Sequence, residues 1–428
     1  MMKKRFFVSI LAGMMTLVAA AQISTTLSPY SQFGLGVLSD QSLGFNRAMG
    51  GVAYGLRSGK FVNMKNPASY SSVDSLTMLF DLGVVGQISN FKEGNKSLNT
   101  KTGNFDYAVA SFRLLPHVGV AAGVVPFSNI GYSYYSSQNI GTSTTVSKEK
   151  HTGDGGISQA FFGAGWELAK GFSVGFNLSY FWGKYTKSIN VSSSDSYVNQ
   201  VSRDYSASMS SYKFDLGAQW QHMVSKYDLL TLGVTASIGH RLNGDAEFKT
   251  TSTNSMTSTT SSTLITVEDA FSIPTTFGIG ASILHKNSLT AAIDYTYQHW
   301  SNIDYPTFDK TTYEMTSGYY KNRHQVAAGV DWLPNPVGRK FLELVHYRMG
   351  VSYATPYYNI GSNNGPSELA VSAGFGIPLY NAWNNRSTLN ISAQWVRFAA
   401  PNSIKENTFR VTIGLTFNER WFAKWKVD

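Results

Sequence analysis

The chain has 428 residues and a formal net charge of +9, but only 14% of its residues are charged and a further 14% are aromatic. Soluble domains usually carry about a quarter of charged residues. The composition therefore suits a large membrane barrel, although a soluble all-β protein stays open on composition alone. The absence of cysteine excludes disulfide bonds and thiol catalysis.

The first residues predict a cleaved secretory signal peptide over residues 1–21. The basic run Lys3-Lys4-Arg5 precedes an apolar stretch, and Ala19-Ala20-Ala21 offers a small-residue cleavage site. The segment is too short for a membrane helix, and no later run of 18 apolar residues exists. An exported chain without such a helix spans a bilayer only as a closed barrel, because every backbone polar group must be paired internally. We therefore expect a multi-pass barrel in the outer membrane of a Gram-negative cell.

Residues 22–74 show no alternation, and we expect them to form a hatch that plugs the lumen. A barrel of about fourteen strands has an interior too wide for side chains alone to fill. Asn66-Pro67-Ala68 predicts a tight turn, because proline fixes φ and asparagine bonds its own nearby backbone. A fixed structural turn and a hatch that shifts on ligand binding are both compatible with this motif.

Residues 75–418 predict an all-β fold, a transmembrane antiparallel β-barrel of about fourteen strands. Apolar and polar residues alternate, most clearly from Phe172 to Trp182, where the bulky apolar side chains share one face. This face is aromatic and continuous, which favours contact with lipid. The predicted strands cover residues 75–91, 104–115, 117–134, 156–168, 171–185, 205–223, 228–243, 271–285, 288–300, 321–333, 344–356, 367–379, 386–397 and 408–418.

Short turns and long polar segments alternate along the chain, as periplasmic turns and extracellular loops do in outer-membrane barrels. The turns are marked by Pro116, Lys170-Gly171, Ser225-Lys226 and Lys286-Asn287. The long segments cover residues 135–155, 186–204, 244–270 and 301–320. Thr250 to Thr263 is almost entirely Ser and Thr, and we expect it to be a mobile external loop, because such a tract buries too little surface to order itself.

Pro126 interrupts one of the predicted strands. Proline cannot donate a hydrogen bond to the ladder, and a closed barrel has no free edge to accommodate it. We therefore expect Pro126 to kink the wall and open a gap. The alternative is that Pro126 ends its strand at the rim.

The inward face combines charges of both signs with many glycines. Charge inside a membrane is costly unless paired or wet, so the mixed signs predict pairing across the lumen or with the hatch rather than a selective ion channel. The glycines either make room for the hatch or relieve barrel curvature. The inward charges are Asp81, Glu167, Lys213, Asp215, Asp294, Asp331, Arg348 and Arg410. The inward glycines are Gly163, Gly165, Gly175, Gly278, Gly280, Gly329, Gly374, Gly376 and Gly414.

Residues 419–428 form an aromatic and basic tail, which we expect on the periplasmic side. Its aromatic residues, Trp421, Phe422 and Trp425, alternate with lysines. The tail either anchors at the membrane interface or docks a protein partner.

Several motifs resemble the FadL family of outer-membrane transporters, which includes TodX-like proteins. Phe33-Gly34, Arg47-Ala48-Met49-Gly50-Gly51 and Asn66-Pro67-Ala68-Ser69 resemble the family's N-terminal hatch. Further resemblances lie in Val125-Pro126-Phe127-Ser128, in Ile273-Pro274 with Asp294-Tyr295, and in Arg348 to Tyr353. The ending Phe417 to Phe422 resembles FadL-like proteins of Bacteroidetes.

This resemblance implies diffusive transport of hydrophobic small molecules, such as long-chain fatty acids, through a plugged barrel. The resemblance also implies a role for the expected gap, which would serve as a lateral exit lined by Pro126, Phe127 and Asn129. Two alternatives stay open, a subunit of an outer-membrane secretion or assembly complex and a general porin. The expected partners are a hydrophobic ligand, outer-membrane lipid and lipopolysaccharide.

The sequence predicts no enzyme, metal site or cofactor. It contains no HExxH motif, no cysteine cluster and no G-x-S-x-G elbow. Gly34-x-Gly36 lacks a following helical pattern, which argues against nucleotide binding. No nucleic-acid partner is expected.

Overall fold

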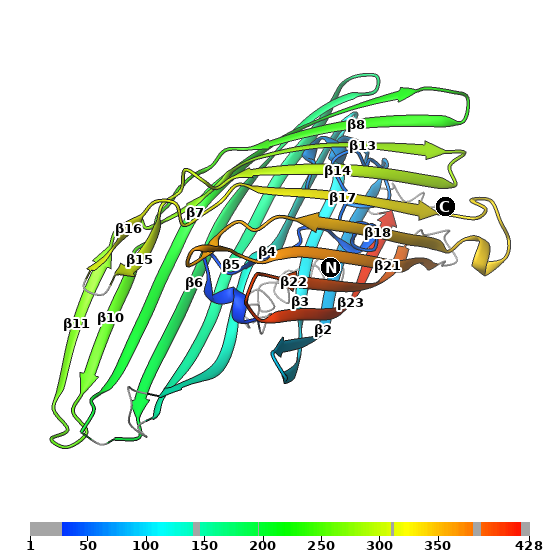
Figure 1. Cartoon of the computed structure of the whole chain (residues 1–428). Helices are drawn as coiled ribbons and strands as arrows, with labels where there is room; N and C mark the ends of the chain where they lie inside the picture. The colour runs from blue at the N-terminus through cyan, green and yellow to red at the C-terminus, as the bar shows by residue number, and fades with distance from the viewer. Residues whose placement is uncertain (1–27, 140–145, 196, 310–311, 380–386, 421–428) are drawn as a thin grey trace, which may run out of the picture.

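The computed structural model describes residues 28–139, 146–195, 197–309, 312–379 and 387–420 (Figure 1). The predicted signal peptide and residues 421–428 of the predicted tail lie outside this part of the chain. Fourteen long strands form the barrel: β2 (Thr77–Glu93), β3 (Lys96–Leu115), β4 (Val118–Asn139), β5 (Val146–Ala169), β6 (Phe172–Ser193), β7 (Gln200–Met223), β8 (Asp228–Ser237), β13 (Thr275–His285), β14 (Leu289–His299), β17 (Arg323–Trp332), β18 (His346–Ala354), β21 (Ser367–Leu379), β22 (Ser387–Ala399) and β23 (Lys405–Arg420).

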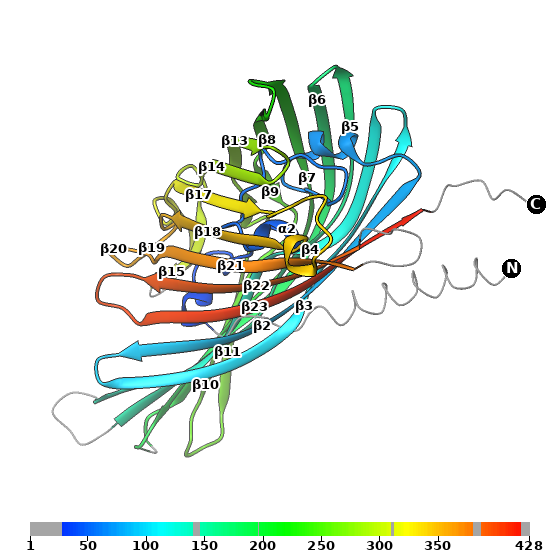
Figure 2. The same ribbon diagram turned by 90° about the vertical axis from the view of Figure 1, so that its right-hand side faces the viewer.

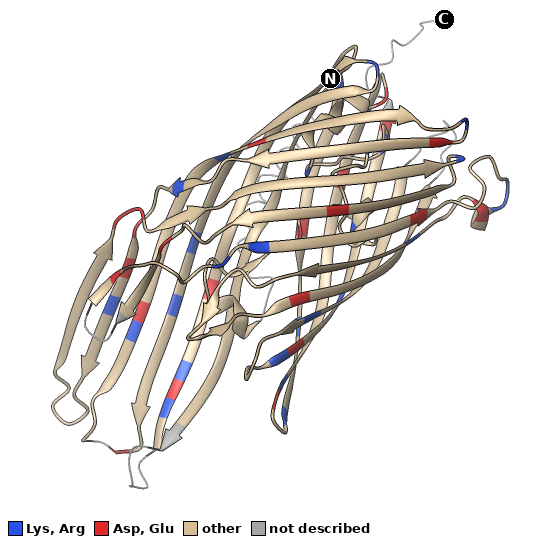
Figure 3. Ribbon diagram, turned by 45° about the horizontal axis from the view of Figure 1, so that its top comes forward, with Lys and Arg blue, Asp and Glu red and all other residues tan. Residues whose placement is uncertain are grey.

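Each barrel strand pairs antiparallel with its neighbours, and β2 pairs with β23 to close the ring. The prediction of a closed fourteen-stranded barrel is therefore confirmed. The predicted alternation in β6 is observed, because Phe172, Leu178 and Tyr180 are exposed on the outside while Ser173 and Asn177 are buried. Charged residues are sparse along the strands (Figure 3). No helix in the described residues is long and apolar enough to cross a membrane.

The two ends of the barrel differ. At one end, here called the short-turn end, tight connections join β3 to β4, β5 to β6, β7 to β8, and β13 to β14. At the other end, the long-loop end, β4 to β7 extend far beyond the remaining strands (Figure 1). There β10 (Ala246–Thr253) pairs with β7 and with β11 (Thr260–Val267), so a curved sheet projects past one side of the mouth.

The prediction of a mobile loop within residues 244–270 is wrong. Thr250 and Thr263 face each other across the β10–β11 hairpin, and β10 lies along the extended edge of β7. Threonine is β-branched and favours strands, and β7 supplies the backbone partners that an isolated tract would lack. The segments predicted as loops over residues 135–155 and 186–204 likewise consist largely of strand extensions.

The remaining elements are short. In the N-terminal segment, residues 28–74, they are η1 (Pro29–Gln32), β1 (Val37–Leu38), α2 (Gly44–Arg47) and η2 (Pro67–Ser72). Those of the connections are β9 (His240–Leu242), β12 (Phe271–Ile273), β15 (Tyr305–Asp309), β16 (Thr312–Thr316), η3 (Phe341–Glu343), β19 (Asn359–Ile360) and β20 (Asn363–Asn364).

The N-terminal segment lies among the strands inside the ring (Figure 2). It contributes to two buried clusters. One joins Leu43 and Met49 to inward residues of the wall such as Phe161. The other, toward the long-loop end, joins Leu35 to aromatic residues of the connections, including Trp300.

Candidate functional site: the filled lumen and the gap between β3 and β4

Four glycines from neighbouring strands form one row across the inner wall. Gly119 is paired with Gly165, Gly165 with Gly175, and Gly175 with Gly217. We call this row the glycine shelf. A Cβ added at Gly119 would lie 1.9 Å from the carbonyl oxygen of Tyr70 in η2. The backbone of the N-terminal segment therefore rests directly on the backbone of the wall.

Gly165 and Gly175 make the same kind of contact, whereas Gly217 lies against the side chains of Asn66 and Pro67. A Cβ at Gly165 would lie 2.4 Å from the carbonyl oxygen of Pro67, and one at Gly175 would lie 2.5 Å from its carbonyl carbon. On the opposite wall, Gly329 is paired with Gly350, and both lie against the backbone of Met49. Glycine weakens a strand unless another backbone approaches closely, so these glycines make room for the N-terminal segment.

Not every inward glycine has this role. A Cβ at Gly163 would meet the side chain of Asn177 first, and one at Gly376 would meet Arg348, both within the wall itself.

Asn66 connects the turn of the Asn66-Pro67-Ala68 motif to its surroundings. Its side chain accepts a hydrogen bond from the N–H of Ala68 (3.2 Å) and donates to the carbonyls of Tyr54 (2.9 Å) and Ala218 (3.2 Å). Proline directly after this N-cap begins η2, where its missing N–H costs nothing. The motif thus holds two parts of the segment and one barrel strand together.

Asp294 holds the N-terminal segment from β14. Its carboxylate accepts hydrogen bonds from the backbone N–H groups of Ala53 (2.5 Å) and Tyr54 (2.9 Å), and the residue is buried. Charge-assisted hydrogen bonds of this type are stronger than neutral ones. Gly280 on β13 lies directly against this carboxylate and leaves room for it.

A bulge in β3 creates a second anchor. The register with β2 shifts at Gly83, so Asp106 and Tyr107 both point inward. Asp106 forms a buried ion pair with Arg47 of α2 (2.8 Å). The Tyr107 hydroxyl donates to Asp81 (3.0 Å) and accepts from the N–H of Gly44 (2.6 Å). A bulge breaks the two-residue alternation, so the local pattern did not identify Asp106 and Tyr107 as inward residues.

The other predicted inward charges have partners on the wall or the N-terminal segment. These contacts are Lys213–Asp215 at 2.6 Å, Arg348–Asp331 at 3.4 Å, Arg348–Asn390 at 2.6 Å, Glu167–Arg57 at 3.8 Å and Arg410–Gln87 at 3.3 Å. The described residues contain no group of three or more His, Asp or Glu that could hold a metal ion.

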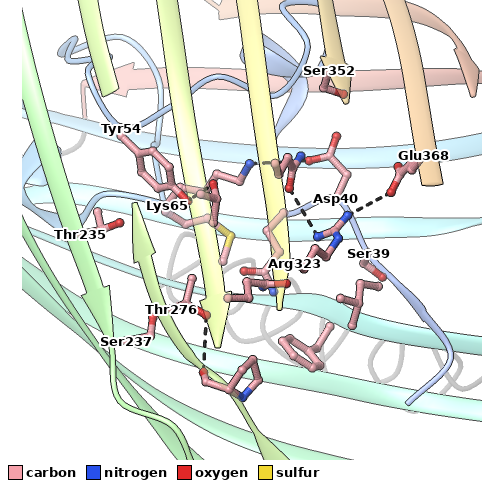
Figure 4. Close-up of a pocket in the computed structure, with 18 of the residues that line it drawn as sticks. Ser39, Asp40, Tyr54, Lys65, Thr235, Ser237, Thr276, Arg323, Ser352 and Glu368 are labelled. Carbon is pink, nitrogen blue, oxygen red and sulfur yellow. Dashed lines mark hydrogen bonds and ion pairs between the residues drawn. The ribbon is translucent and has the colours of Figure 1, made fainter. Parts of the chain in front are cut away.

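A polar cavity of about 140 Å³ remains between the N-terminal segment and the wall (Figure 4). Its lining includes the ion pairs Arg323–Glu368 (3.0 Å) and Lys65–Asp40 (3.9 Å). Burial alone would raise the pKa of Asp40, but Lys65 and Arg47 lower it to about 2. This charged lining suits water or a polar solute better than a hydrocarbon.

The barrel wall separates between β3 and β4. Their pairing ends with the pair Ala108 and Val124. Among the described residues, no β3–β4 pair lies beyond it toward the long-loop end. Pro126 lies two residues further along β4, followed by a bulge at Phe127. We call this separation the wall gap. The residues predicted for a lateral exit therefore lie at its edge.

The N-terminal segment runs along the edge of β4 that faces the wall gap. In β1, Val37 and Leu38 pair with Asn129 and Ser128 of β4. On either side of these pairs, Ser28 donates to Gly131 O (2.8 Å) and Ser39 donates to Phe127 O (2.9 Å). The segment replaces the missing strand partner.

Aromatic residues of the connections cover this part of the segment. The tyrosine cluster comprises Tyr305, Tyr319, Tyr320, Tyr357 and Tyr358. The Tyr358 hydroxyl donates to Tyr30 O (3.1 Å), and Gly34 donates its N–H to the Tyr319 hydroxyl (3.0 Å). Phe33 stacks on Tyr358 at 5.5 Å.

A buried lysine completes the contact. Lys187 donates from Nζ to the Gln32 carbonyl (2.7 Å), and its Nζ lies 4.8 Å from the Tyr185 ring centre. Neither Lys187 nor the tyrosine cluster was singled out from the sequence, because single tyrosines in polar loops carry no periodic signal.

The glycines of the predicted hatch motif also lie in the lumen. Gly50 and Gly51 have φ of +70° and +79°, and the N–H of Gly50 donates to Ser372 Oγ (2.9 Å). Phe33 and Gly34 therefore contact the long-loop half of the lumen, while Gly50, Gly51 and the Asn66 turn contact the short-turn half.

Comparison with known proteins gives a family and a fold. A family model described as BamG matches residues 1–428. The chain is similar to the toluene transporter TbuX of Ralstonia pickettii (14% identity, TM-score 0.58, covering 91% of this chain and 99% of that one). It is also similar to a Pseudomonas aeruginosa FadL homologue (13%, 0.61, 90% and 100%) and to the Pseudomonas putida toluene transporter TodX (13%, 0.60, 91% and 100%). No curated protein matches. At these identities the likeness to solved structures concerns the fold, which is that of outer-membrane barrels.

Proposed function

Because the chain belongs to the BamG family and shares its barrel fold with toluene transporters, we propose that it lets hydrophobic small molecules cross into the outer membrane through a plugged barrel with a lateral exit. The observation that carries this proposal is the wall gap, where β4 continues beside β1 instead of β3. Long-chain fatty acid-like compounds are the proposed ligand class. By the rule for outer-membrane barrels, the short-turn end faces the periplasm and the long-loop end faces outward.

The proposed route avoids the polar cavity. Phe127 packs against Phe181 at 4.9 Å, and both belong to the aromatic cluster near the long-loop end. Pro126 points outward beside Phe127, at the level where Trp182 ends the apolar belt of β6. An apolar molecule that enters among the aromatic residues would leave at Phe127 into the outer leaflet.

We propose that only the first part of the N-terminal segment moves. Residues 44–73 rest on the glycine shelf and on Asp294, which supports a fixed anchor. Residues 28–39 are held by two β1–β4 pairs, by the backbone hydrogen bonds that flank these pairs, by Lys187 and by tyrosine hydroxyls, and these contacts can be exchanged one at a time. Opening the gap then requires β1 to leave β4 while the anchor stays in place.

A reversible disulfide tests this movement. The chain has no cysteine, so Leu38→Cys with Ser128→Cys introduces a single pair at facing positions of β1 and β4. Facing residues of antiparallel strands lie within the Cα distance that a disulfide spans. We expect uptake of radiolabelled oleate by cells to stop under oxidation and to return after reduction.

The control pair is Ala110→Cys with Ala122→Cys, which joins β3 to β4 below the wall gap. Its oxidation should leave uptake unchanged. Equal uptake by the oxidised and reduced Leu38–Ser128 variant would overturn the proposed route.

A second candidate function is a subunit of an outer-membrane secretion or assembly complex. The observation that favours it is the curved sheet of β4 to β7, β10 and β11, which projects past the mouth and offers a surface on which a protein partner could bind (Figure 1). Purification from native membranes in mild detergent distinguishes the two functions. A stoichiometric protein partner would favour the subunit, and a monomer with retained lipid or ligand would favour transport. A general porin is disfavoured by the filled lumen.

A further inference from the structure

The outer face of the barrel carries a large apolar groove. It has a volume of about 640 Å³ and spans β5, β6, β7, β8 and the start of β13. Its floor is formed by small outward side chains, those of Ala164, Ala218 and Ala236. Its sides are formed by larger ones: Trp166, Phe176, Phe214, Leu216 and Phe277. We call this the outer groove.

The outer groove lies directly behind the glycine shelf. Gly165, Gly175 and Gly217 also border it, because they alternate with the outward residues of the same strands. Inside, these glycines leave room for η2, and outside the neighbouring alanines leave room for another molecule. The wall is therefore lined by small side chains on both faces at this place.

The outer groove begins near the short-turn end. Val174 is two residues from the start of β6 at Phe172, which is about 7 Å at a rise of about 3.3 Å per residue. Ala236 is eight residues from the start of β8 at Asp228, which is about 26 Å along that strand. Because barrel strands are tilted and the apolar part of a bilayer is about 30 Å thick, the groove runs from near the short-turn end into the acyl-chain layer.

Three lysines lie on the turns below the outer groove. Lys170, Lys226 and Lys286 are exposed and belong to the β5–β6, β7–β8 and β13–β14 turns. Nζ of Lys226 lies 5.8 Å and Nζ of Lys286 lies 5.5 Å from the ring centre of Tyr227. Basic residues therefore flank the end of the groove that faces the lipid headgroups, and basic segments are visible at these tips (Figure 3).

The acidic residues beside these lysines are already engaged. Asp228 is bound to His285 at 2.6 Å, and Glu167 contacts His117 at 3.3 Å. Within the described part of the chain, none of the three lysines has an ion-pair partner within 4.0 Å. Their positive charges thus remain available to an anionic group.

We propose that the outer groove and the three lysines form a binding site for an anionic phospholipid of the periplasmic leaflet. One acyl chain occupies the groove over the alanine floor, and the anionic headgroup lies at the level of the turns that carry Lys170, Lys226 and Lys286, with its phosphate between Lys226 and Lys286, which share Tyr227. The combination of an apolar groove at acyl-chain depth with positive charge at headgroup depth selects an anionic lipid over a zwitterionic one.

Native mass spectrometry of the full-length protein tests this site. Detergent-solubilised protein is titrated with phosphatidylglycerol and, in parallel, with phosphatidylcholine of the same acyl chains. We expect preferential retention of phosphatidylglycerol. The triple variant with Lys170→Gln, Lys226→Gln and Lys286→Gln should lose the preference for phosphatidylglycerol over phosphatidylcholine. Each lysine removed should weaken phosphatidylglycerol binding about fivefold. Ala218→Phe with Ala236→Phe should fill the groove and weaken binding of both lipids.

The matched control is Ala328→Phe, which places the same side chain on the outer face of β17, away from the groove. This variant should bind phosphatidylglycerol as the natural chain does. Heat-modifiable migration on gels verifies that the barrel of each variant is folded. The lysine variant changes only exposed turns, so it tests the site even if the groove variant misfolds. Equal binding of the two lipids by the natural chain would overturn the proposal. Unchanged phosphatidylglycerol binding by the lysine variant would also overturn it, as would a protein partner captured in native membranes by a photoreactive residue introduced in place of Ala218.

Discussion

Replacing Gly175 by alanine should loosen the N-terminal segment without disturbing the barrel. A Cβ at this position would lie 2.5 Å from the carbonyl carbon of Pro67, whereas ordinary contacts begin near 3.4 Å. The backbone of η2 would therefore have to retreat by about 0.9 Å. Overpacking of this kind costs about 1–3 kcal/mol. Since 1.4 kcal/mol corresponds to a factor of ten, the dislodged fraction should rise roughly five- to hundredfold.

Single-channel conductance in planar bilayers measures this effect. Gly175→Ala should show more frequent openings than the natural chain. Gly86→Ala is the matched control, because a Cβ there meets nothing within 4 Å. It makes the same chemical change in a strand but touches no part of the N-terminal segment. If the two variants conduct alike, the glycine shelf does not seat the plug.

Three further predictions concern the same assembly. Deleting residues 22–60 should raise conductance to a permanently open level, and an unchanged conductance would mean that this segment does not block the lumen. Asp294→Asn keeps the shape but removes the charge that receives two backbone N–H groups, so thermal unfolding should show a loss of about 1–3 kcal/mol; no loss would show that Asp294 is not an anchor. Pro126→Ala restores an N–H donor at the wall gap and should reduce ligand uptake severalfold, whereas full uptake would argue against a lateral exit there.

The barrel itself could be predicted because each strand encodes its own two faces. The predicted strand 367–379 coincides with β21, and six further strands lie within three residues of their expected bounds. At the long-loop end, β3, β5 and β6 extend eight to ten residues further than predicted, because they continue beyond the apolar belt. Alternation with a period of two residues can be recognised within a single strand. Because lipid covers the outer face, every second residue of each membrane-spanning strand must be apolar. Local pattern therefore sufficed for strand number and for the apolar-out orientation.

Features that depend on distant partners could not be predicted in the same way. The hairpin of β10 and β11 needs the edge of β7, and a Ser/Thr tract alone gives no sign of that edge. The role of the inward glycines stayed undecided because the contact that explains Gly175 comes from Pro67, far away in the chain. Likewise, Asp106 points to Arg47 only because one extra residue changes the facing of β3.

The closure of the ring by β2 and β23 has a consequence for biogenesis. The first and last strands of the wall meet only when the whole chain has been delivered. The glycine shelf that receives the N-terminal segment spans β4 to β7, so this surface can form before β23 is available. We therefore expect the N-terminal segment to settle on these four strands before the ring is closed.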